Sequence, residues 1–196
     1  MPVPRNRKPR SVSRPPIERA PIERPHPVAA FDASCVQRLN RLLDHRPCLI
    51  AARAISRLGD GEVWLLLIAL LAVLPGGAGI RCALHMLVVG AAGLLIYGLL
   101  KRRTARRRPC VSLQGLRLCM PPLDEFSFPS GHTLHATSFA LVALHHLPAL
   151  GLGLLAFAVL TALVRVMLGL HYPSDVLAGA VLGAALALTS LWLLPG

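Results

Sequence analysis

Residues 149–175 read ALGLGLLAFAVLTALVRVMLGLHYPSD, and this stretch decides the predicted fold. Its first 21 residues are apolar apart from Thr161 and Arg165, and a helix needs about 20 mostly apolar residues to cross a membrane. A turn that contains His171 and Asp175 follows. A charge inside a span costs about 2.5–3.5 kcal/mol on insertion scales. Arg165 is therefore expected to face a partner or a water-filled cavity.

Four other apolar runs accompany this stretch, and the chain as a whole is poor in charge. Hydrophobic residues make up 54% of the 196 residues and charged residues 15%, whereas soluble domains carry about 25% charged residues. The pattern predicts an all-α, multi-pass transmembrane helical bundle with about five spans. The expected spans are Glu62–Ile80, Cys82–Leu100, Gly131–Leu147, Ala149–Gly169 and Asp175–Leu194.

The chain before the spans divides into two segments. Residues 1–35 are rich in proline and basic residues. They are expected to form a disordered tail, because they cannot bury enough apolar area to offset the entropy of ordering. Residues 36–60 mix apolar and basic residues at helical spacing, which is typical of an amphipathic segment in the membrane interface. Residues 61–196 then form the membrane domain.

The net charge of +12 does not indicate a nucleic-acid-binding protein, because the charge is unevenly placed. Twelve of the 21 Lys and Arg residues lie in the first 57 residues, and six more lie between Lys101 and Arg108. A nucleic-acid module would instead spread its basic face over a folded, water-exposed surface. The lipid bilayer, and not nucleic acid, is therefore the expected partner.

Three polar segments interrupt the apolar pattern, and the first two are candidates for anion binding. The run Lys101–Pro109 offers guanidinium groups and one ammonium to phosphate oxygens, although a charged stop at a helix end is the simpler interpretation. Pro129-Ser130-Gly131-His132 opens the third span, and free N–H groups at a helix start bind anions. A capped helix with an incidental histidine explains Ser130 but not an ionisable side chain at this depth.

The third segment holds Arg165, His171 and Asp175. A carboxylate placed just after a histidine can hold one ring N–H, which leaves the other ring nitrogen free to attack. A structural ion pair between Arg165 and Asp175 is the alternative. Two membrane crossings separate His132 from His171, and the basic run adjoins the loop before His132. All three segments are therefore predicted to lie on one side of the membrane.

Together these segments resemble the type 2 phosphatidic acid phosphatase (PAP2) superfamily, which shares its fold core with vanadium haloperoxidases and glucose-6-phosphatase. The family pattern is Lys-x6-Arg-Pro, then Pro-Ser-Gly-His, then Ser-Arg-x5-His-x3-Asp. The resemblance covers roughly residues 60–195 and is that of a small bacterial member. The one departure is Val164, where the family usually has Ser, and it removes one hydroxyl donor to the phosphate.

The resemblance implies a phosphatase that needs no metal or other cofactor and works through a phosphohistidine. It implies that His171 is the nucleophile, that Asp175 orients it, and that His132 protonates the leaving group and then activates water. The residues that would bind the substrate phosphate are Lys101, Arg108, Ser130, Gly131 and Arg165. In the sequence itself, no Cys/His spacing suits zinc.

The remaining polar residues are expected either to support the catalytic residues or to lie at the membrane interface. His135, one turn after His132, is a candidate to support it, and Cys110 and Cys119 are expected to be free rather than paired. The residues expected at the membrane interface are Arg102, Arg103, Arg106, Arg107, Asp60 and Glu62.

The expected substrate is a lipid phosphate or polyprenyl diphosphate that arrives from the bilayer, of the undecaprenyl diphosphate, phosphatidylglycerophosphate or phosphatidic acid type. The resemblance favours an active site on the extracytoplasmic face of the cell's inner membrane. The excess of basic residues near this site favours the cytoplasmic face instead. A lipid-linked phosphotransferase with the same site, and a catalytically silent lipid-binding scaffold, are the alternative functions.

Overall fold

The computed structural model describes residues 27–117, 120–121 and 124–194, and within these ranges the regular structure is helical. Most of the expected tail lies outside the described residues. Residues 27–35, which were assigned to the tail, instead form the beginning of a helix. The helices are α1 (Pro27–Asn40), η1 (Arg41–Asp44), α2 (Arg46–Leu58), α3 (Gly61–Ala72), α4 (Ala78–Thr104), α5 (Pro109–Ser112), α6 (Gly131–His146), α7 (Pro148–Met167) and α8 (Pro173–Leu193).

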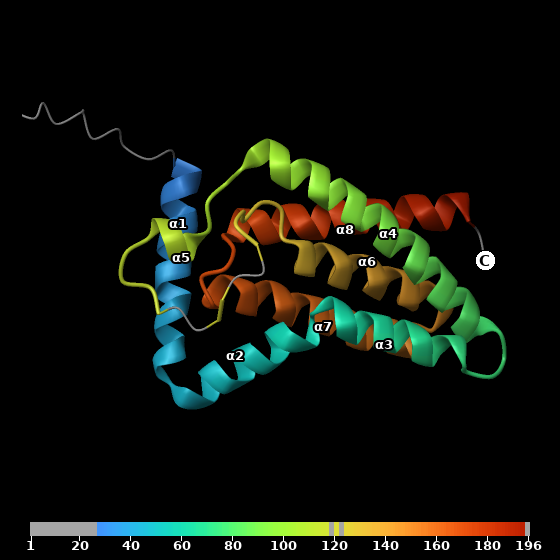
Figure 1. The fold of residues 1–196 in the computed structure, drawn as a ribbon. Coiled ribbons are helices and arrows are strands. Elements are labelled where there is room, and N and C mark those ends of the chain that lie inside the picture. Colours follow the sequence, from blue (N-terminus) through green and yellow to red (C-terminus); the bar gives the residue numbers. More distant parts are fainter. Residues whose placement is uncertain (1–26, 118–119, 122–123, 195–196) are drawn as a thin grey trace, which may run out of the picture.

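Helix α6 is the centre of the bundle. It packs against α4, α7 and α8, while α3 packs against α4. Helices α1 and α2 cross one end of the bundle, where they contact α7, and the C-terminus lies at the other end (Figure 1). The prediction of an all-α helical bundle is confirmed.

The helix boundaries differ from the expected spans. Among the described residues, the helices α4, α7 and α8 are long and apolar enough to cross a membrane, whereas α3 and α6 are shorter. The first expected span is interrupted because Gly76 and Gly77 adopt positive φ angles of 95° and 74°, which glycine tolerates without steric cost. Helix α4 therefore begins at Ala78 and continues through Lys101, which lies in its last turn and not in a loop.

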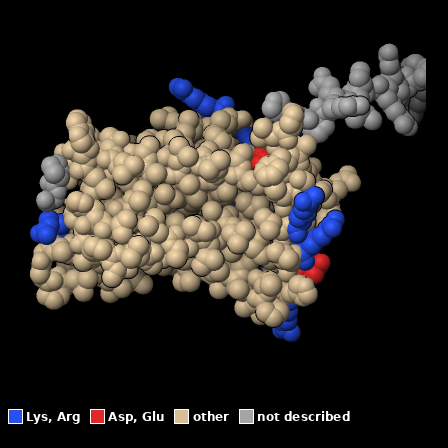
Figure 2. All heavy atoms as spheres, turned by 180° about the vertical axis from the view of Figure 1, so that it is seen from behind, with Lys and Arg blue, Asp and Glu red and all other residues tan. Residues whose placement is uncertain are grey.

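The outer surface of the bundle is apolar over a broad middle belt. Large side chains such as Leu95 and Val159 are exposed there, each with 70% of its surface accessible. On the face that Figure 2 shows, the front of this belt carries no charged side chain. Lys and Arg gather mainly at the end that carries α1 and α2, with further basic side chains at the top edge and at the opposite end. Such an exposed apolar surface is suited to lipid rather than water.

Small residues bring α8 close to α6. A Cβ atom added to Gly179 would lie 2.5 Å from the carbonyl oxygen of Ser130, and one added to Gly183 would collide with the carbonyl oxygen of Leu134. Small residues of this kind allow close helix approach where no hydrophobic driving force acts between helices. The start of α6 is thus placed directly beside the start of α8, and this positions the polar segments of the two helices together.

Candidate active site

The imidazole of His171 lies in the connection between α7 and α8 and is 2% exposed. Its Nδ1 atom lies 2.6 Å from the carbonyl oxygen of Ser127, which can only accept, so Nδ1 carries the proton. Its Nε2 atom lies 3.2 Å from Nη1 of Arg108 and 3.5 Å from Nη2 of Arg165. The nitrogen with the free lone pair therefore points at two guanidinium groups.

The protonation state of His171 follows from these surroundings. Burial, and after it the charges of Arg165 and Arg108, lowers the pKa of the His171 imidazole well below its ordinary value of 6.5. The ring is consequently neutral near pH 7. A neutral imidazole with one fixed N–H and one free lone pair is a competent nucleophile.

Arg165 is a buried cation with little to balance its charge. It is 2% exposed, its Nη1 donates to Oγ of Ser56 at 2.9 Å, and its Nε has no hydrogen-bond partner among the described residues. Within the part of the chain that the structure describes, no carboxylate lies within 4.0 Å of its guanidinium. The alternative of an Arg165–Asp175 ion pair is therefore wrong, and the unbalanced charge favours an external anion.

Arg108 and Lys101 form the rest of a cationic cage, which Asp124 closes. Arg108 donates to the carbonyl oxygen of Leu170 at 2.7 Å and to Oδ1 of Asp124 at 2.6 Å. The other carboxylate oxygen of Asp124 pairs with Lys101 and accepts from Tyr97 Oη at 2.6 Å. An anionic group thus already occupies the outer side of the cage.

The pKa of Asp124 shows how strongly this cage favours a negative charge. Burial alone would raise the pKa of the carboxyl, but hydrogen bonds from Lys101, Tyr97 and Arg108 outweigh it and bring the pKa to about 2. Sequence reasoning did not single out Asp124, because it stands alone in the loop and belongs to none of the three segments.

Asp175 is fully buried but does not bond directly to the ring of His171. Its Oδ2 lies 3.9 Å from Nδ1 of His171 and accepts from the backbone N–H of Tyr172 at 2.8 Å. Its Oδ1 accepts from Arg106 at 2.6 Å. The carboxylate is therefore placed to stabilise charge on the ring across a short gap, while the Ser127 carbonyl fixes the tautomer.

Arg106 was expected to be a charge at the membrane interface, and its two ion pairs inside the protein were not predicted. Its guanidinium bridges Asp175 and Asp32, the latter at 2.7 Å, and lies 4.1 Å from the ring centroid of Tyr172. Asp32 belongs to α1, far from the motif in sequence. In the sequence, Arg106 is one of several arginines in the basic run. Nothing in that run distinguishes it as the partner of Asp175.

The start of α6 supplies a helix N-terminus beside the cage. Ser130 is the fully buried N-cap residue, and its Oγ lies 3.4 Å from the backbone N–H of Thr133 that it caps. Gly131 packs against Tyr97 so closely that a Cβ atom would lie 2.8 Å from the ring. The first-turn N–H groups and dipole of α6 favour an anion here.

His132 lies in the first turn of α6 and has a carboxylate partner. Its Nε2 lies 2.9 Å from Oδ1 of Asp60, in the turn between α2 and α3. Asp60 was expected at the membrane interface, and its contact with His132 was not predicted. Two glycines flank Asp60 in the sequence. Because glycine has no side chain, this turn can lie close to another helix, and that was the available sequence signal for the contact.

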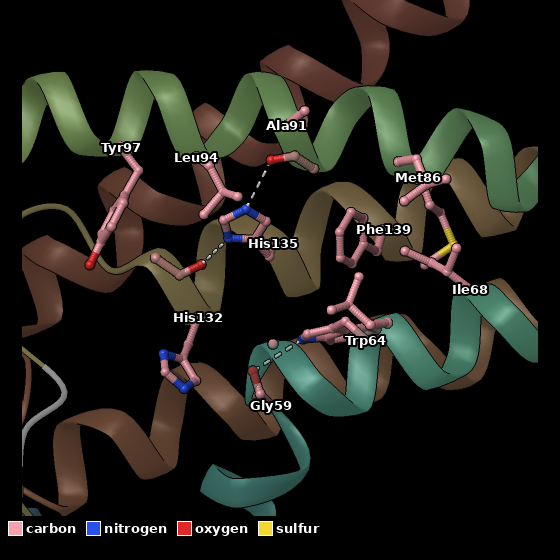
Figure 3. A pocket seen from close by; sticks show the side chains of 15 residues that line it. Gly59, Trp64, Ile68, Met86, Ala91, Leu94, Tyr97, His132, His135 and Phe139 are labelled. Carbon is pink, nitrogen blue, oxygen red and sulfur yellow. Dashed lines mark hydrogen bonds between the residues drawn. The ribbon is translucent and has the colours of Figure 1, made fainter.

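An apolar groove leads from His132 into the bundle. It has a volume of about 400 Å³ and runs between α3, α4 and α6 (Figure 3). His132 and Tyr97 lie at one end, and Ile68 and Met86 lie at the other. His135 lines its middle and bonds to the Gly131 carbonyl at 2.9 Å. Tyr97, at the same end as His132, donates to Asp124, so this end of the groove adjoins the cage.

The comparison with known proteins now decides the family. A family model described as the PAP2 superfamily matches residues 82–195. The chain belongs to the PAP2 superfamily. It is therefore a membrane phosphatase, as the sequence predicted.

Several of its relatives within the PAP2 superfamily are named as phosphatases. The chain is 36% identical over 147 residues to the decaprenylphosphoryl-5-phosphoribose phosphatase of Mycobacterium tuberculosis, covering 73% of this chain and 78% of the relative. It is 31% identical over 160 residues to the lipid A 1-phosphatase of Rhizobium etli, covering 70% and 68%. A crystal structure of the PAP2-type phosphatidylglycerolphosphate phosphatase of Bacillus subtilis superposes with a TM-score of 0.68 at 27% identity, covering 85% of each chain.

Val164 marks where this PAP2 protein departs from the family pattern. Its side chain is 4% exposed and packs in an apolar cluster with Leu43, Ala52 and Leu168. The residue thus contributes to the contact of α7 with the helices at its end. The hydroxyl that holds the neighbouring Arg165 comes from Ser56 of α2.

Cys110 is a free cysteine, and Cys119 lies outside the described residues, so the expectation about this pair stays a prediction. Among the described residues, no three His, Cys, Asp or Glu side chains are grouped so that they could hold a metal ion.

Proposed function

We propose that this PAP2 phosphatase hydrolyses a phosphate ester or diphosphate carried by a membrane lipid, through a phosphohistidine on Nε2 of His171. The observation that carries the proposal is the pairing of a neutral, lone-pair-bearing Nε2 with Arg165, a buried guanidinium that lacks an anionic partner among the described residues. A phosphoryl group between them would offer phosphorus to the lone pair of Nε2 and oxygens to the guanidinium of Arg165.

In the first step, Nε2 of His171 attacks phosphorus and the bond to the lipid oxygen breaks. His132 gives its proton to that oxygen, which leaves as an alcohol or, from a diphosphate, as a phosphate ester. Lys101, Arg108 and Arg165 stabilise the equatorial oxygens as charge develops. Nδ1 keeps its proton, which is held by the Ser127 carbonyl, and Asp175 lies 3.9 Å from the ring as it becomes cationic.

In the second step, a water molecule attacks the phosphohistidine while His132 takes its proton. The N–P bond breaks, phosphate leaves, and the lone pair returns to Nε2 of His171. His132 ends protonated and is ready for the next lipid. Each histidine thus returns to its starting state without a metal ion in the sequence of steps.

The apolar groove supports a lipid substrate. A chain that lies between Ile68 and Met86 would enter from the bilayer side of α3 and α4 and bring its phosphate to His132. Relatives of this protein act on a decaprenyl-linked phosphate and on lipid A 1-phosphate, as their names state. A polyprenyl-linked phosphate or a phospholipid monoester is the proposed substrate class.

The proposed orientation places the active site on the extracytoplasmic face of the inner membrane. Basic residues near spans normally favour the cytoplasm. Lys101, Arg106 and Arg108, however, bind carboxylates or line the cage, so the chemistry of the site accounts for their position. These three residues are therefore poor indicators of orientation.

The test measures phosphate release in detergent, with EDTA present, from phosphatidic acid, phosphatidylglycerophosphate and undecaprenyl diphosphate. The variants His171→Ala and His132→Ala are compared with His145→Ala, an exposed histidine at the far end of α6. Loss of activity in the first two and full activity in the third is expected. With labelled 4-nitrophenyl phosphate, whose leaving group departs without a proton, the phosphoryl group should be trapped on His132→Ala in a base-stable, acid-labile form, because the variant lacks the base that activates water. Activity that survives His171→Ala, or that requires a metal, contradicts the mechanism.

A further inference from the structure

The turn Gly59-Asp60-Gly61 joins α2 to α3, and the carboxylate of Asp60 forms a hydrogen bond outside its own helix. Asp60 is the N-cap residue of α3, yet its side chain makes no capping hydrogen bond. A carboxylate at this position normally accepts a bond from the first turn of its own helix. Asp60 instead directs Oδ1 to Nε2 of His132, 2.9 Å away and 72 residues along the chain.

The turn is held firmly against the ring of His132. Trp64 donates from Nε1 to the carbonyl oxygen of Gly59 at 3.1 Å, and its ring packs edge-on against Phe139 with centroids 5.1 Å apart. A Cβ atom on Gly59 would lie 3.3 Å from Cδ2 of His132. Figure 3 shows Gly59 and His132 side by side at the mouth of the groove, with Trp64 anchoring the turn.

The other nitrogen of His132 remains available. Because Nε2 faces a carboxylate, it carries a proton, and the chemistry of the reaction falls to Nδ1. Among the residues that the structure describes, Nδ1 of His132 has no hydrogen-bond partner. His132 also lines the groove that leads toward the cage. A leaving-group oxygen is thus the partner that Nδ1 lacks.

The electrostatic surroundings give Asp60 a second task. Burial of the ring acts most strongly against a positive charge on His132, and the charges of Arg165 of α7 and His135 of α6 act in the same direction, as does His171 of the α7–α8 connection. Asp60 of the α2–α3 turn opposes them. Arg165 disfavours a second positive charge on His132, and a carboxylate in hydrogen-bond contact favours it. The protonated His132 that the first step needs therefore depends on Asp60.

We propose that Asp60 is a positioning residue for His132. This inference rests on the proposed function, in which His132 is the general acid and base. Asp60 accepts the Nε2–H of His132, fixes the ring so that Nδ1 faces the leaving oxygen, and stabilises the protonated ring. In the first step the Nδ1–H bond breaks as the proton moves to the lipid oxygen, while the Nε2–H stays with Asp60.

The experiment compares Asp60→Asn with Glu62→Gln, which removes the same charge from an exposed residue in the same helical turn. Two substrates separate acid catalysis from other defects. Phosphatidic acid has a poor alkoxide leaving group that needs a proton, whereas 4-nitrophenyl phosphate has a leaving group that departs without one. General acid catalysis contributes about 10²–10⁴ in rate. For Asp60→Asn we expect a loss of about 10–100 in kcat/KM on phosphatidic acid and less than about threefold on 4-nitrophenyl phosphate.

Two further readouts exclude a purely structural role. The alkaline limb of kcat/KM, which reports protonated His132, should move to lower pH by about one unit in Asp60→Asn. Adding Asp60→Asn to His132→Ala should cause no further loss on phosphatidic acid, since the two residues act as one unit. Asp60→Glu, which keeps the carboxylate, should recover part of the activity. Glu62→Gln should match the wild type in each measurement.

The outcomes distinguish this inference from the proposed function. An inactive wild type, or an active His171→Ala, refutes the proposed function whatever Asp60 does. If both of those behave as proposed, an Asp60→Asn variant that retains activity on phosphatidic acid refutes the role of Asp60. Equal losses on both substrates, or an unmoved alkaline limb, also refute it, because they indicate a structural defect rather than a defect in the proton donor.

Discussion

The side chain of His171 gives the clearest prediction at the scale of a single residue. Its pKa is lowered by burial and by two guanidinium groups, so its imidazole should stay neutral when the pH falls below 6.5. The unfolded chain would bind a proton there and the folded chain would not. The free energy of unfolding should therefore decrease as the pH falls below 6.5.

Histidine-labelled protein in detergent micelles allows a direct test by NMR. The His171 signal, identified by its absence in His171→Ala, should keep the chemical shift of the neutral, Nδ1-protonated ring from pH 8 to well below pH 6.5. A midpoint at or above pH 6.5 would contradict the burial of this ring between Arg108 and Arg165. It would also remove the basis for a neutral nucleophile.

Asp124 leads to a second prediction at this scale. Its carboxylate contacts Lys101 and Arg108, and a substrate phosphate would meet it as a like charge. Asp124→Asn should therefore tighten the binding of inorganic phosphate by about tenfold, which corresponds to about 1.4 kcal/mol. The neighbouring Glu125 is exposed, and Glu125→Gln is the matched control that should leave binding unchanged.

The inhibition constant of phosphate against lipid hydrolysis provides the measurement. Because the pKa of Asp124 is about 2, the carboxylate stays ionised at every pH used for assays, and the effect should not vary with pH. Weaker phosphate binding in Asp124→Asn would show that the carboxylate organises the cations of the cage rather than competing with the substrate.

The sequence predicted the residues of the cage but not their carboxylate partners. Motifs such as Pro129-Ser130-Gly131-His132 are local, so their spacing alone places the side chains on one helix start. Asp60 and Arg106 meet their partners across 72 and 69 residues. No local sequence pattern predicts which carboxylate or arginine makes such a long-range contact, because the contact depends on how the helices pack.

At the scale of the helices, Arg106 joins α1 to the start of α8. It bonds to Asp32 and Asp175, which are 1% and 0% exposed. Removing one partner of a buried ion pair costs about 3–5 kcal/mol, because it leaves charge uncompensated. Arg106→Ala should therefore lower the apparent Tm in detergent by about 10 °C and should reduce activity through Asp175.

Arg107→Ala is the matched control, since this arginine is the next residue and its side chain is exposed. It should leave the apparent Tm within about 1 °C of the wild type, as expected for an exposed substitution. If both variants unfold at the same temperature as the wild type, the bridge does not hold α1 to the bundle.

Helix boundaries show where sequence reasoning about elements reached its limit. Hydropathy located the apolar runs that became α4, α7 and α8, because lipid-facing helices must be apolar over most of their length. It placed the break between the first two spans too late, since the turn at Gly76 and Gly77 depends on backbone conformation rather than hydropathy. Residues 27–35 were misassigned because the packing of α1 against α7 and α8 is not visible in their composition.

For the whole molecule, the decisive property is which face of the membrane carries the active site. Helix α2 lies at the active-site end of the bundle, and its Cys48 is exposed (Figure 1). The other cysteines can be replaced to leave Cys48 as the single thiol. A membrane-impermeant maleimide should label this variant in intact spheroplasts of a bacterial host if the site is extracytoplasmic.

A second single-cysteine variant, His145→Cys, supplies the matched control for this orientation. Residue 145 is exposed in the last turn of α6, at the opposite end of the bundle. It should react only after the membrane is permeabilised. The reverse pattern would place the cage in the cytoplasm, and the basic residues around it would then obey the charge bias that usually orients membrane proteins. Substrate would in that case have to reach the groove from the inner leaflet, so labelling of these two positions also decides which leaflet supplies the lipid.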